Sequence, residues 1–465
     1  MKIDVSASVA DRADRAFDAT VNQLIGYLRH PAISCETEHA GDVAKLADKI
    51  SNDLRTLGLQ SEVLHVAGAL PCVAANWLQA GADKPTVLIY GHLDLQPVQG
   101  ENWHTPPHEA TIRGDRLYAR GAADDMGGWV SHLAAVAAWL GETDELPCNI
   151  RLIIEGEEEI GSPNLERYMD AFPEAFQADA MVLTDCENPS TDVPGLTVSL
   201  RGICEFVVTV SALDADGHSG LWGNMVPDVS TALMQLISRL IDRDGRPTLG
   251  LRQTPQKLRD AAAAVPIPPE VIRRGAHLRH GVEPLPPRDK PAAEWMWLQP
   301  AITVVATTYP PRERKKNALR SQVQAVLSVR TAPGQTAAEM FDLINAELTR
   351  DVPQGVLVEV VQERGAGEGW LYEPKGPAFV AADNAYERAW GHKLVRVGVG
   401  GSIPFVALFG RRFGSLPLIL NGVMDPETTA HGPNESLHLG VFRRAIAANV
   451  YLYHELAQPG VLRQG

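Results

Sequence analysis

Hydrophobic and polar positions follow two periods in the first part of the chain. Apolar residues recur at helical spacing over residues 13–28 and 41–57, which predicts two helices, and Gly58 is a stop signal. Short continuous apolar runs predict buried strands at residues 86–90, 150–154 and 180–183. A helix is predicted between the first two strands, at residues 126–140. This β-α-β alternation predicts a mostly parallel sheet that is covered by helices.

The pattern changes near Leu196. Half-exposed strands are predicted at residues 207–210 and 324–329, and helices at residues 226–240 and 337–348. The stretch from Pro255 to Pro291 is rich in proline and arginine, which predicts loops around a short helix. Residues 196–370 are therefore predicted to form an inserted α+β domain.

The α/β pattern returns at Pro374. The remaining elements are predicted to be a helix at residues 378–390, a strand at 417–420 and a closing helix at 437–456. The predicted fold class is α/β, with a mostly parallel sheet flanked by helices in a main domain that an α+β domain interrupts. The main domain would comprise residues 1–195 and 371–465, and the insertion residues 196–370.

The charge of the chain limits its partners. The formal net charge is −15 at pH 7. Nucleic-acid phosphates are bound by an excess of lysine and arginine, so we expect no nucleic-acid partner. One basic run, at residues 312–316, is interpreted as a solvated loop.

The location of the protein is predicted from features that the sequence lacks. No apolar run is long enough to span a bilayer, so no membrane partner is expected. The first residues contain no apolar core of a secretory signal. The five cysteines are widely spaced and form no C-x-x-C motif, which argues against a disulfide framework and against a cysteine zinc site. These features predict a cytoplasmic protein.

Polar segments lie next to the predicted strands and helices. Residues 90–94 (YGHLD), 155–162 (EGEEEIGS) and 184–185 (TD) follow strands, whereas residues 120–125 (RGAADD) and 430–435 (AHGPNE) precede helices. Ligands bind beyond the carboxyl ends of the strands in open α/β sheets, so these segments are expected to meet in one crevice. Several carboxylates placed together require a cation. Imidazole and carboxylate donors without thiolate suit zinc, and also manganese or cobalt.

In their order and spacing, these segments resemble a known family. It is the co-catalytic dinuclear zinc family of carnosinase-like dipeptidases, carboxypeptidase G, aminoacylase, acetylornithine deacetylase and succinyl-diaminopimelate desuccinylase. The segments GHLDLQPV, LYARGAADD and DADGHSGLWG are most similar to the carnosinase-like branch. The resemblance covers nearly the whole chain. It implies a catalytic main domain with two divalent metal ions and an inserted lid that forms a homodimer.

The resemblance also implies a set of metal ligands: His92, Asp124, Glu159, Asp185 and His431. Asp124 would bridge the two ions. His92 and Asp185 would complete the first site, and Glu159 and His431 the second. Glu187 is an alternative to Asp185.

Further roles in catalysis follow from the same resemblance. Glu158 would be the general base that takes a proton from the metal-bound water to give the attacking hydroxide, and Asp94 would orient His92. His218, in the lid, would reach the active site of the partner subunit and donate a hydrogen bond to the developing oxyanion.

Four residues are expected to bind the substrate: Asn317, Arg330, Gly401 and Ser402. Arg330 and the loop at residues 400–404 (GGSIP), here called the glycine loop, would hold its carboxylate end. The chain departs from the family pattern at three positions. Met126 replaces a lysine after the two aspartates, Val399 stands where a glutamate is usual, and Arg320 replaces a proline. These positions lie where the ends of the substrate are expected to bind, and none of them is a predicted metal ligand.

The expected activity is metal-dependent hydrolysis of the amide bond of a dipeptide or similar small peptide with a free carboxylate. An N-acyl amino acid deacylase or a glutamate-type carboxypeptidase of the same family is the alternative. A non-catalytic binding protein on the same fold is a more distant one, since relatives that lose activity usually lose a ligand or the base.

Overall fold

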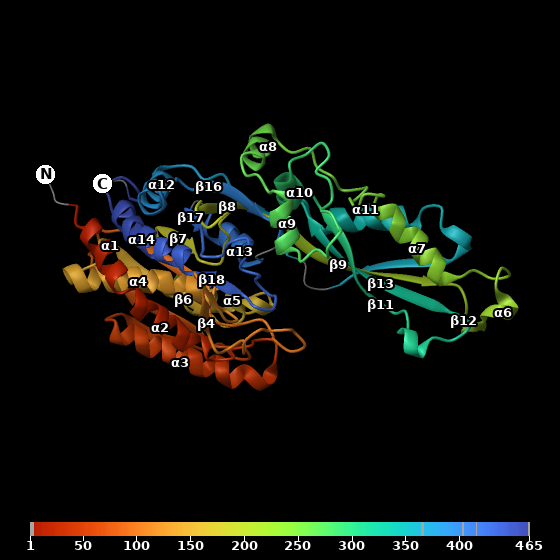
Figure 1. The fold of residues 1–465 in the computed structure, drawn as a ribbon, viewed down its shortest axis with the longest axis horizontal. Coiled ribbons are helices and arrows are strands. Elements are labelled where there is room, and N and C mark those ends of the chain that lie inside the picture. The colour runs from red at the N-terminus through yellow and green to blue at the C-terminus, as the bar shows by residue number, and fades with distance from the viewer. Residues whose placement is uncertain (1–3, 364–366, 402–403, 415, 464–465) are drawn as a thin grey trace.

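A six-stranded sheet forms the centre of the larger of two lobes (Figure 1). The computed structural model describes residues 4–363, 367–401, 404–414 and 416–463. The strands follow the order β1 (Gln60–Leu64), β2 (Cys72–Trp77), β6 (Asn149–Glu155), β3 (Thr86–His92), β7 (Ala180–Leu183) and β17 (Leu418–Leu420). Strands β6, β3, β7 and β17 are parallel, which confirms the mostly parallel sheet. Strands β1 and β2 add an antiparallel edge, a common feature of mixed sheets that the sequence analysis did not predict.

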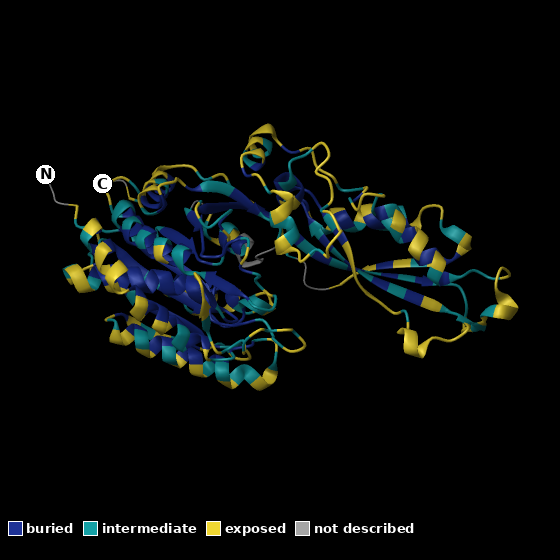
Figure 2. Ribbon diagram, in the orientation of Figure 1, coloured by how far each residue is buried: buried dark blue, intermediate teal, exposed yellow. Residues whose placement is uncertain are grey.

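Both faces of the sheet are buried along its four parallel strands, which explains why these strands are mostly continuous apolar runs. Side chains alternate across a strand, so Val87 and Ile89 of β3 enter one core cluster and Leu88 and Tyr90 enter another. The first cluster contains helices α1 (Ser6–Arg15), α2 (Phe17–Leu28), α3 (Ala40–Thr56), α4 (Met126–Thr143), α12 (Pro377–Trp390) and α14 (Leu439–Leu456). The second contains α5 (Leu165–Ala171) and α13 (Pro404–Phe413). Figure 2 shows the buried residues concentrated in these layers.

One helix prediction in this lobe is wrong. Residues 13–28 form parts of two helices, because the backbone at Ala16 leaves the helical region with ψ near 1°. Helix α1 ends at Arg15 and α2 starts at Phe17.

The smaller lobe contains a four-stranded antiparallel sheet. Its order is β11 (Ala301–Thr307), β13 (Gln322–Thr331), β9 (Gly202–Ser211) and β14 (Leu357–Gln362). Helices α7 (Val229–Leu240) and α11 (Ala337–Thr349) pack on one face. Residues alternate between buried and half-buried along β9 and most of β13, as predicted. Helix α7 starts later than predicted because Asp228 caps it, accepting a hydrogen bond from the backbone N–H of Ser230.

The proline-rich stretch contains more helix than predicted. It holds α8 (Gln256–Ala263) and α9 (Pro269–Gly275), and α10 (Ala292–Leu298) follows directly. Prolines precede or begin these helices, and the fixed φ of proline suits the first helical position. Trp297 and Ala262 pack in a small cluster with Val397 of the larger lobe.

The chain leaves the larger lobe just after β8 (Gly195–Leu200). This strand pairs with β16 (Val395–Val399) and with β15 (Trp370–Leu371), and Leu196 and Val198 lie in the first core cluster. Strand β9 of the smaller lobe starts directly afterwards, at Gly202. The domain limits stay a prediction. The contacts of β8 favour Arg201 as the residue at which the chain first passes from the larger lobe into the smaller one.

The remaining elements are short. They are β4 (Thr111–Arg113), β5 (Arg116–Tyr118), β18 (Ser436–His438), β10 (Gly217–His218), β12 (Ala318–Leu319) and α6 (Ser219–Trp222). The described residues also contain the 3₁₀ turns η1 (Thr37–His39), η2 (Glu158–Ile160), η3 (Pro173–Phe176), η4 (Arg312–Arg314) and η5 (Pro353–Gly355). Across the described residues, none of the helices has both the length and the apolar character needed to cross a membrane.

Candidate metal centre

The carboxyl ends of three adjacent parallel strands bring the predicted ligands together. Strand β3 ends at His92, and its neighbours β6 and β7 end at Glu155 and Leu183. The loops after these strands therefore leave the sheet at the same edge. Glu158 lies in the turn after β6 and Asp185 lies two residues after β7.

Two groups of potential ligand atoms share His92. One atom each from His92, Glu158 and Asp185 lie within 4.8 Å of one another. The same holds for His92, Asp124 and Glu159. The His92 Nε2 atom lies 3.2 Å from Asp124 Oδ1. The four carboxyl groups thus surround a single imidazole.

His431 joins this group from the loop before β18. Its Nε2 atom lies 3.1 Å from Asp124 Oδ2 and 3.2 Å from Glu159 Oε2. Asp124 therefore faces His92 with one oxygen and His431 with the other. All five predicted ligands converge, and Asp124 lies between the two imidazoles.

The charges at this site require compensation. Burial raises the pKa of Glu158, and the charges of Asp185 and other nearby carboxylates raise it further. Burial also raises the pKa of Asp185, to about 7, and the charge of Asp124 adds to this effect. Asp124 behaves differently, because contacts with His431 and His92 outweigh its burial and lower its pKa. In the described part of the chain, no lysine or arginine forms an ion pair with these three carboxylates. The donor set therefore fits divalent cations.

Asp94 contacts the backbone more closely than it contacts the His92 ring. Its two carboxylate oxygens accept hydrogen bonds from the backbone N–H groups of Glu158 and Glu159, at 3.1 and 3.0 Å. The His92 Nδ1 atom lies 3.1 Å from the Asp94 carbonyl oxygen and 3.5 Å from its carboxylate. Asp94 thus fixes the turn that carries both glutamates and holds the ring mainly through its own carbonyl.

Comparison with known proteins decides the family. The sequence profile of peptidase family M20/M25/M40 matches residues 88–455. The chain belongs to this peptidase family.

Relatives and solved structures agree with that assignment. The chain is 34% identical to the cysteinylglycine-S-conjugate dipeptidase of Corynebacterium striatum over 89% of this chain and 90% of the relative. It is 26% identical to the Cys-Gly metallodipeptidase dug1 of Schizosaccharomyces pombe over 96% of this chain and 97% of the relative. The fold is similar to that of human carnosine dipeptidase 1, with a TM-score of 0.82, 23% identity and coverage of 98% of this chain and 99% of the other. The predictions of a metallohydrolase acting on peptide C–N bonds and of an α/β catalytic and lid architecture are confirmed.

Asp125 is a supporting residue of the peptidase that the sequence analysis did not single out. Its carboxylate is buried and accepts hydrogen bonds from the Thr184 hydroxyl, at 2.6 Å, and from the His92 backbone N–H, at 3.3 Å. Methyl groups at Gly91 or Gly128 would collide with this carboxylate. One side chain therefore joins the segments that carry His92, Asp124 and Asp185, and only its place beside Asp124 signalled this.

Glu435 was also left without a role. It accepts hydrogen bonds at 3.0–3.1 Å from the backbone N–H groups of Gly121, Ala123 and Asp124. Its carboxylate also lies 3.1 Å from Arg120 Nη1. The buried Glu435 thus joins the loop of His431 to the loop of Asp124. Its position in the HGPNE segment was the available signal.

The predicted lid residues of the peptidase occupy two places. His218 and Asn317 are exposed and lie beside α6 and β12, at the end of the smaller lobe away from the metal centre (Figure 1). The Ser219 backbone N–H donates to the Asn317 carbonyl at 3.1 Å, which holds the two together. Within one chain the structure does not bring either residue to the metal centre. Arg330 lies at the other end of the lid, near the C-terminus of β13.

The glycine loop is held by an arginine that the sequence analysis missed. Arg201 Nε donates to the Gly400 carbonyl at 2.8 Å. Burial, and then the nearby charge of Arg330, lower the pKa of Arg201 to about 10. Gly401 is half-buried beside this loop, and Ser402 lies outside the described residues. Arg201 could have been noticed only from its place at the crossing between the lobes.

The three departures from the family pattern have different surroundings. Met126 is fully buried as the first residue of α4, so an apolar side chain follows the two aspartates. Val399 is the last residue of β16 and is half-buried. Arg320 Nη1 donates to Asp216 Oδ2 at 2.8 Å, so it fastens the segment that carries His218.

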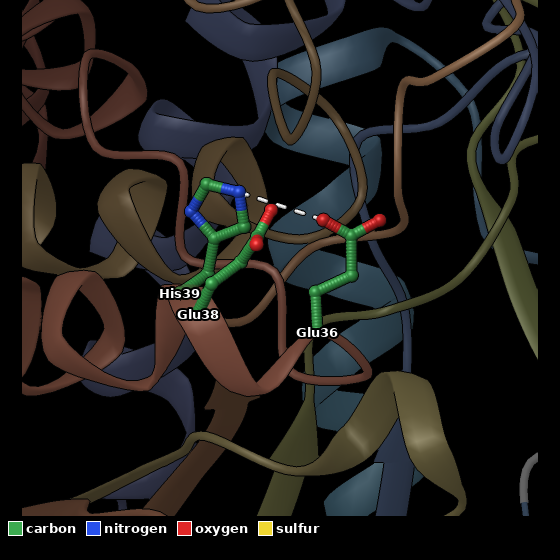
Figure 3. Close-up of side chains that lie close together, drawn as sticks. All are labelled: Glu36, Glu38 and His39. Atoms are coloured by element: carbon green, nitrogen blue, oxygen red, sulfur yellow. Dashed lines mark ion pairs between the residues drawn. The ribbon is translucent and has the colours of Figure 1, made fainter.

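A further group of possible ligands lies on the surface of the larger lobe. Figure 3 shows Glu36, Glu38 and His39, with an ion pair of 3.5 Å between His39 and Glu36. Asp42 also approaches the ring, at 3.1 Å. Exposed acidic groups of this kind are common without a metal ion, so we assign no site here.

Proposed function

We propose that this peptidase is a homodimeric dipeptidase with two divalent metal ions in each chain. Its substrates would be dipeptides or similar small peptides with a free α-carboxylate. The convergence of two imidazoles and four carboxylates at one sheet edge supports this proposal most directly. The names of its relatives, a cysteinylglycine-S-conjugate dipeptidase and a Cys-Gly metallodipeptidase, favour dipeptides over longer chains.

The metal ligands in this proposal are those that the geometry groups. His92 and Asp185 would hold the first ion and Glu159 and His431 the second, with Asp124 between them. Glu187 is exposed and in the described residues belongs to none of the ligand groups, so Asp185 is the better candidate. We propose zinc, with manganese or cobalt as alternatives. When bound, the two ions would lower the pKa of water so that hydroxide is available at neutral pH, and would polarise the scissile carbonyl.

Glu158 moves the proton in this mechanism. Its carboxylate lies beside His92 and Asp185, and its backbone is fixed by Asp94. It would take a proton from the attacking water and later give it to the leaving amine. Burial is the largest cause that raises the pKa of Glu158. A raised pKa favours the protonated carboxyl group, which has to hold the proton before giving it to the amine.

The substrate would be held by residues of both lobes and of both subunits. Arg330, whose guanidinium group matches a carboxylate, and Gly401 would bind its carboxylate end. His218 and Asn317 would act in the active site of the partner subunit, because their own metal centre lies at the far side of the molecule (Figure 1). Ser402 stays a proposal from the sequence.

A homodimer is supported by an uncovered apolar surface on the lid. A groove of about 440 Å³ is lined by residues that include Leu233, Met234, Ile237, Val304 and Tyr309. Strand β11 lies at the edge of its sheet, and Val305 on it is 54% exposed. An exposed apolar edge strand is a template for pairing, and a second copy would cover it symmetrically. A cytoplasmic location is also part of the proposal, and the five free cysteines agree with it.

Metal removal and a substrate panel test the proposal together. Chelation should abolish hydrolysis, and zinc, manganese or cobalt should restore it. The panel compares Cys-Gly and Ala-Ala with their C-terminal amides and with N-acetyl-alanine, and released products are identified by mass. We expect cleavage of the free dipeptides and a roughly tenfold or greater loss on amidation, since a hydrogen bond to a charged group contributes about 1.5–3 kcal/mol.

Three outcomes would contradict the proposal. Full activity in protein whose metal content has been shown to be negligible would exclude the metal mechanism. Preferred cleavage of N-acetyl-alanine would support the alternative, an N-acyl amino acid deacylase. Equal cleavage of free and amidated dipeptides would exclude recognition of the carboxylate.

A further inference from the structure

The loop between β11 and β12 is an exposed basic segment in an acidic chain. Arg312, Arg314, Lys315 and Lys316, here called the basic loop, are exposed, whereas the whole chain has a net charge of −15. Among the described residues none of these four cations forms an ion pair, although the structure contains many ion pairs elsewhere. The exposed Glu313 offsets one of these charges and Asp216 lies near Lys316, so a net positive charge faces solvent, or whatever approaches this end of the lid.

The basic loop is held against the lid residues that are proposed to act in the partner's active site. It leads directly into Asn317 and β12, and β12 pairs with β10 so that His218 lies opposite Ala318. The Arg320–Asp216 ion pair of 2.8 Å and the hydrogen bond from the Ser321 N–H to Asp216 fasten the far side of the same segment. Any ligand that reaches His218 and Asn317 therefore also meets the field of the basic loop.

The metal centre itself offers no excess of positive charge to an anion. Its four carboxylates, from Asp124, Glu158, Glu159 and Asp185, formally balance two divalent cations. Asp94 and Glu435 add further buried carboxyl groups beside it. Attraction of a second negative charge on a substrate thus has to come from outside the metal centre.

We propose that the basic loop of one subunit selects anionic substrates for the active site of its partner. The substrate class is dipeptides that carry a carboxylate on a side chain in addition to the terminal one. This inference rests on the proposed function, because it requires the lid of one chain to lie over the metal centre of the other. Rim charges mainly change the rate of encounter and its salt dependence, so the effect belongs in kcat/KM and not in kcat.

The test uses a pair of substrates that differ only in charge. Ala-Glu and Ala-Gln have the same shape, and their kcat/KM values are compared in the metal-loaded enzyme at low and at high salt. In a variant with R312Q, R314Q and K315Q, kcat/KM for Ala-Glu should fall roughly tenfold at low salt, as expected for lost electrostatic steering. The value for Ala-Gln should change less than about twofold. Salt should reduce the preference of the unmodified enzyme, because exposed charges are screened beyond about 8 Å at physiological ionic strength.

A matched control removes the same number of exposed cations elsewhere. Arg15, Arg243 and Arg279 are exposed and likewise form no ion pair in the described residues. The triple variant R15Q, R243Q and R279Q should retain the preference for Ala-Glu. Lys316 is left unchanged because it adjoins Asn317.

The possible outcomes distinguish failure of selection by the basic loop from failure of the proposed dipeptidase function. Equal losses for Ala-Glu and Ala-Gln, or no loss for either, would overturn selection by the basic loop while leaving the dipeptidase intact. Equal losses of the Ala-Glu preference in both triple variants would also overturn it, since the effect would then be one of net charge. If the unmodified enzyme cleaves Cys-Gly but neither of these two dipeptides, this inference fails and the proposed function stands. If it cleaves no dipeptide at all, both fail.

Discussion

At the scale of single residues, two adjacent glutamates face different partners. Glu158 and Glu159 lie in one 3₁₀ turn, and Asp94 accepts a hydrogen bond from the backbone N–H of each. The Glu159 carboxylate reaches Asp124 and His431, whereas that of Glu158 faces His92 and Asp185. Gln96 Nε2 also donates to Glu159, at 2.8 Å. Glu159 is thus held in a fixed position, as a ligand requires.

Exchanging each glutamate for glutamine should separate proton transfer from metal binding. Glu158→Gln should keep both metal ions and lower kcat by about 10²–10⁴-fold, the usual contribution of general acid–base catalysis. Glu159→Gln, the matched variant one residue away, should lose metal instead. Metal content by mass spectrometry and kcat on a cleaved dipeptide measure the two effects. If Glu158→Gln loses its metal and Glu159→Gln keeps it, the two roles have been exchanged.

At the scale of elements, one carboxylate joins two loops of the metal centre. Glu435 lies next to β18 and binds three backbone N–H groups of the segment that precedes α4. Arg116 supports the same region from β5, because its guanidinium group donates to Asp425 at 2.8 Å and to the Ser436 hydroxyl. The positions of Asp124 and His431 therefore depend on contacts between elements that lie far apart in the sequence.

Glu435→Gln should weaken this junction. The amide keeps the shape of the side chain but loses the charge that its N–H donors and Arg120 require, so the free energy of unfolding should fall by about 1.5–3 kcal/mol. Metal affinity should fall with it. Glu427→Gln is the control in the same loop, because Glu427 is exposed and its 2.7 Å ion pair with Arg274 should contribute less than about 1 kcal/mol. Thermal unfolding and metal titration measure the difference, and equal behaviour of the two variants would contradict the assigned role of Glu435.

At the scale of the whole molecule, the two lobes separate groups that the proposed mechanism needs together. His218 lies at the far end of the lid from its own metal centre, as the position of α6 in Figure 1 shows. The long β9 and β13 strands extend the lid away from the crossing at Arg201. A complete active site would therefore need the lid of a second chain.

Complementation between inactive chains tests this arrangement. His218→Ala and Glu158→Gln chains are each expected to be inactive. In a mixed dimer, one of the two sites combines an intact Glu158 with an intact His218 from the partner. A statistical mixture should therefore recover about a quarter of the unmodified activity. The control mixes Glu158→Gln chains with chains that carry both His218→Ala and Glu158→Gln. No intact site can form in that mixture, because every chain lacks Glu158. A fully active monomer at assay concentration would refute the shared site.

The sequence by itself determined the elements with a clear period and the order of the chemical segments. The buried run of β3 and the apolar, largely buried helix α4 depend on local patterns, and both lie where they were predicted. The convergence of His92, Glu158 and Asp185 follows from the same patterns, because neighbouring parallel strands end at one edge.

The tertiary structure alone decided which groups support that centre. The contacts of Glu435 with the Asp124 segment, of Asp125 with Thr184, and of Arg201 with Gly400 join residues far apart in the chain. The antiparallel edge formed by β1 and β2 also depends on pairing with distant β6. A local period records which face of an element is buried, but not which distant group covers it. These supports became visible only once the chain was folded.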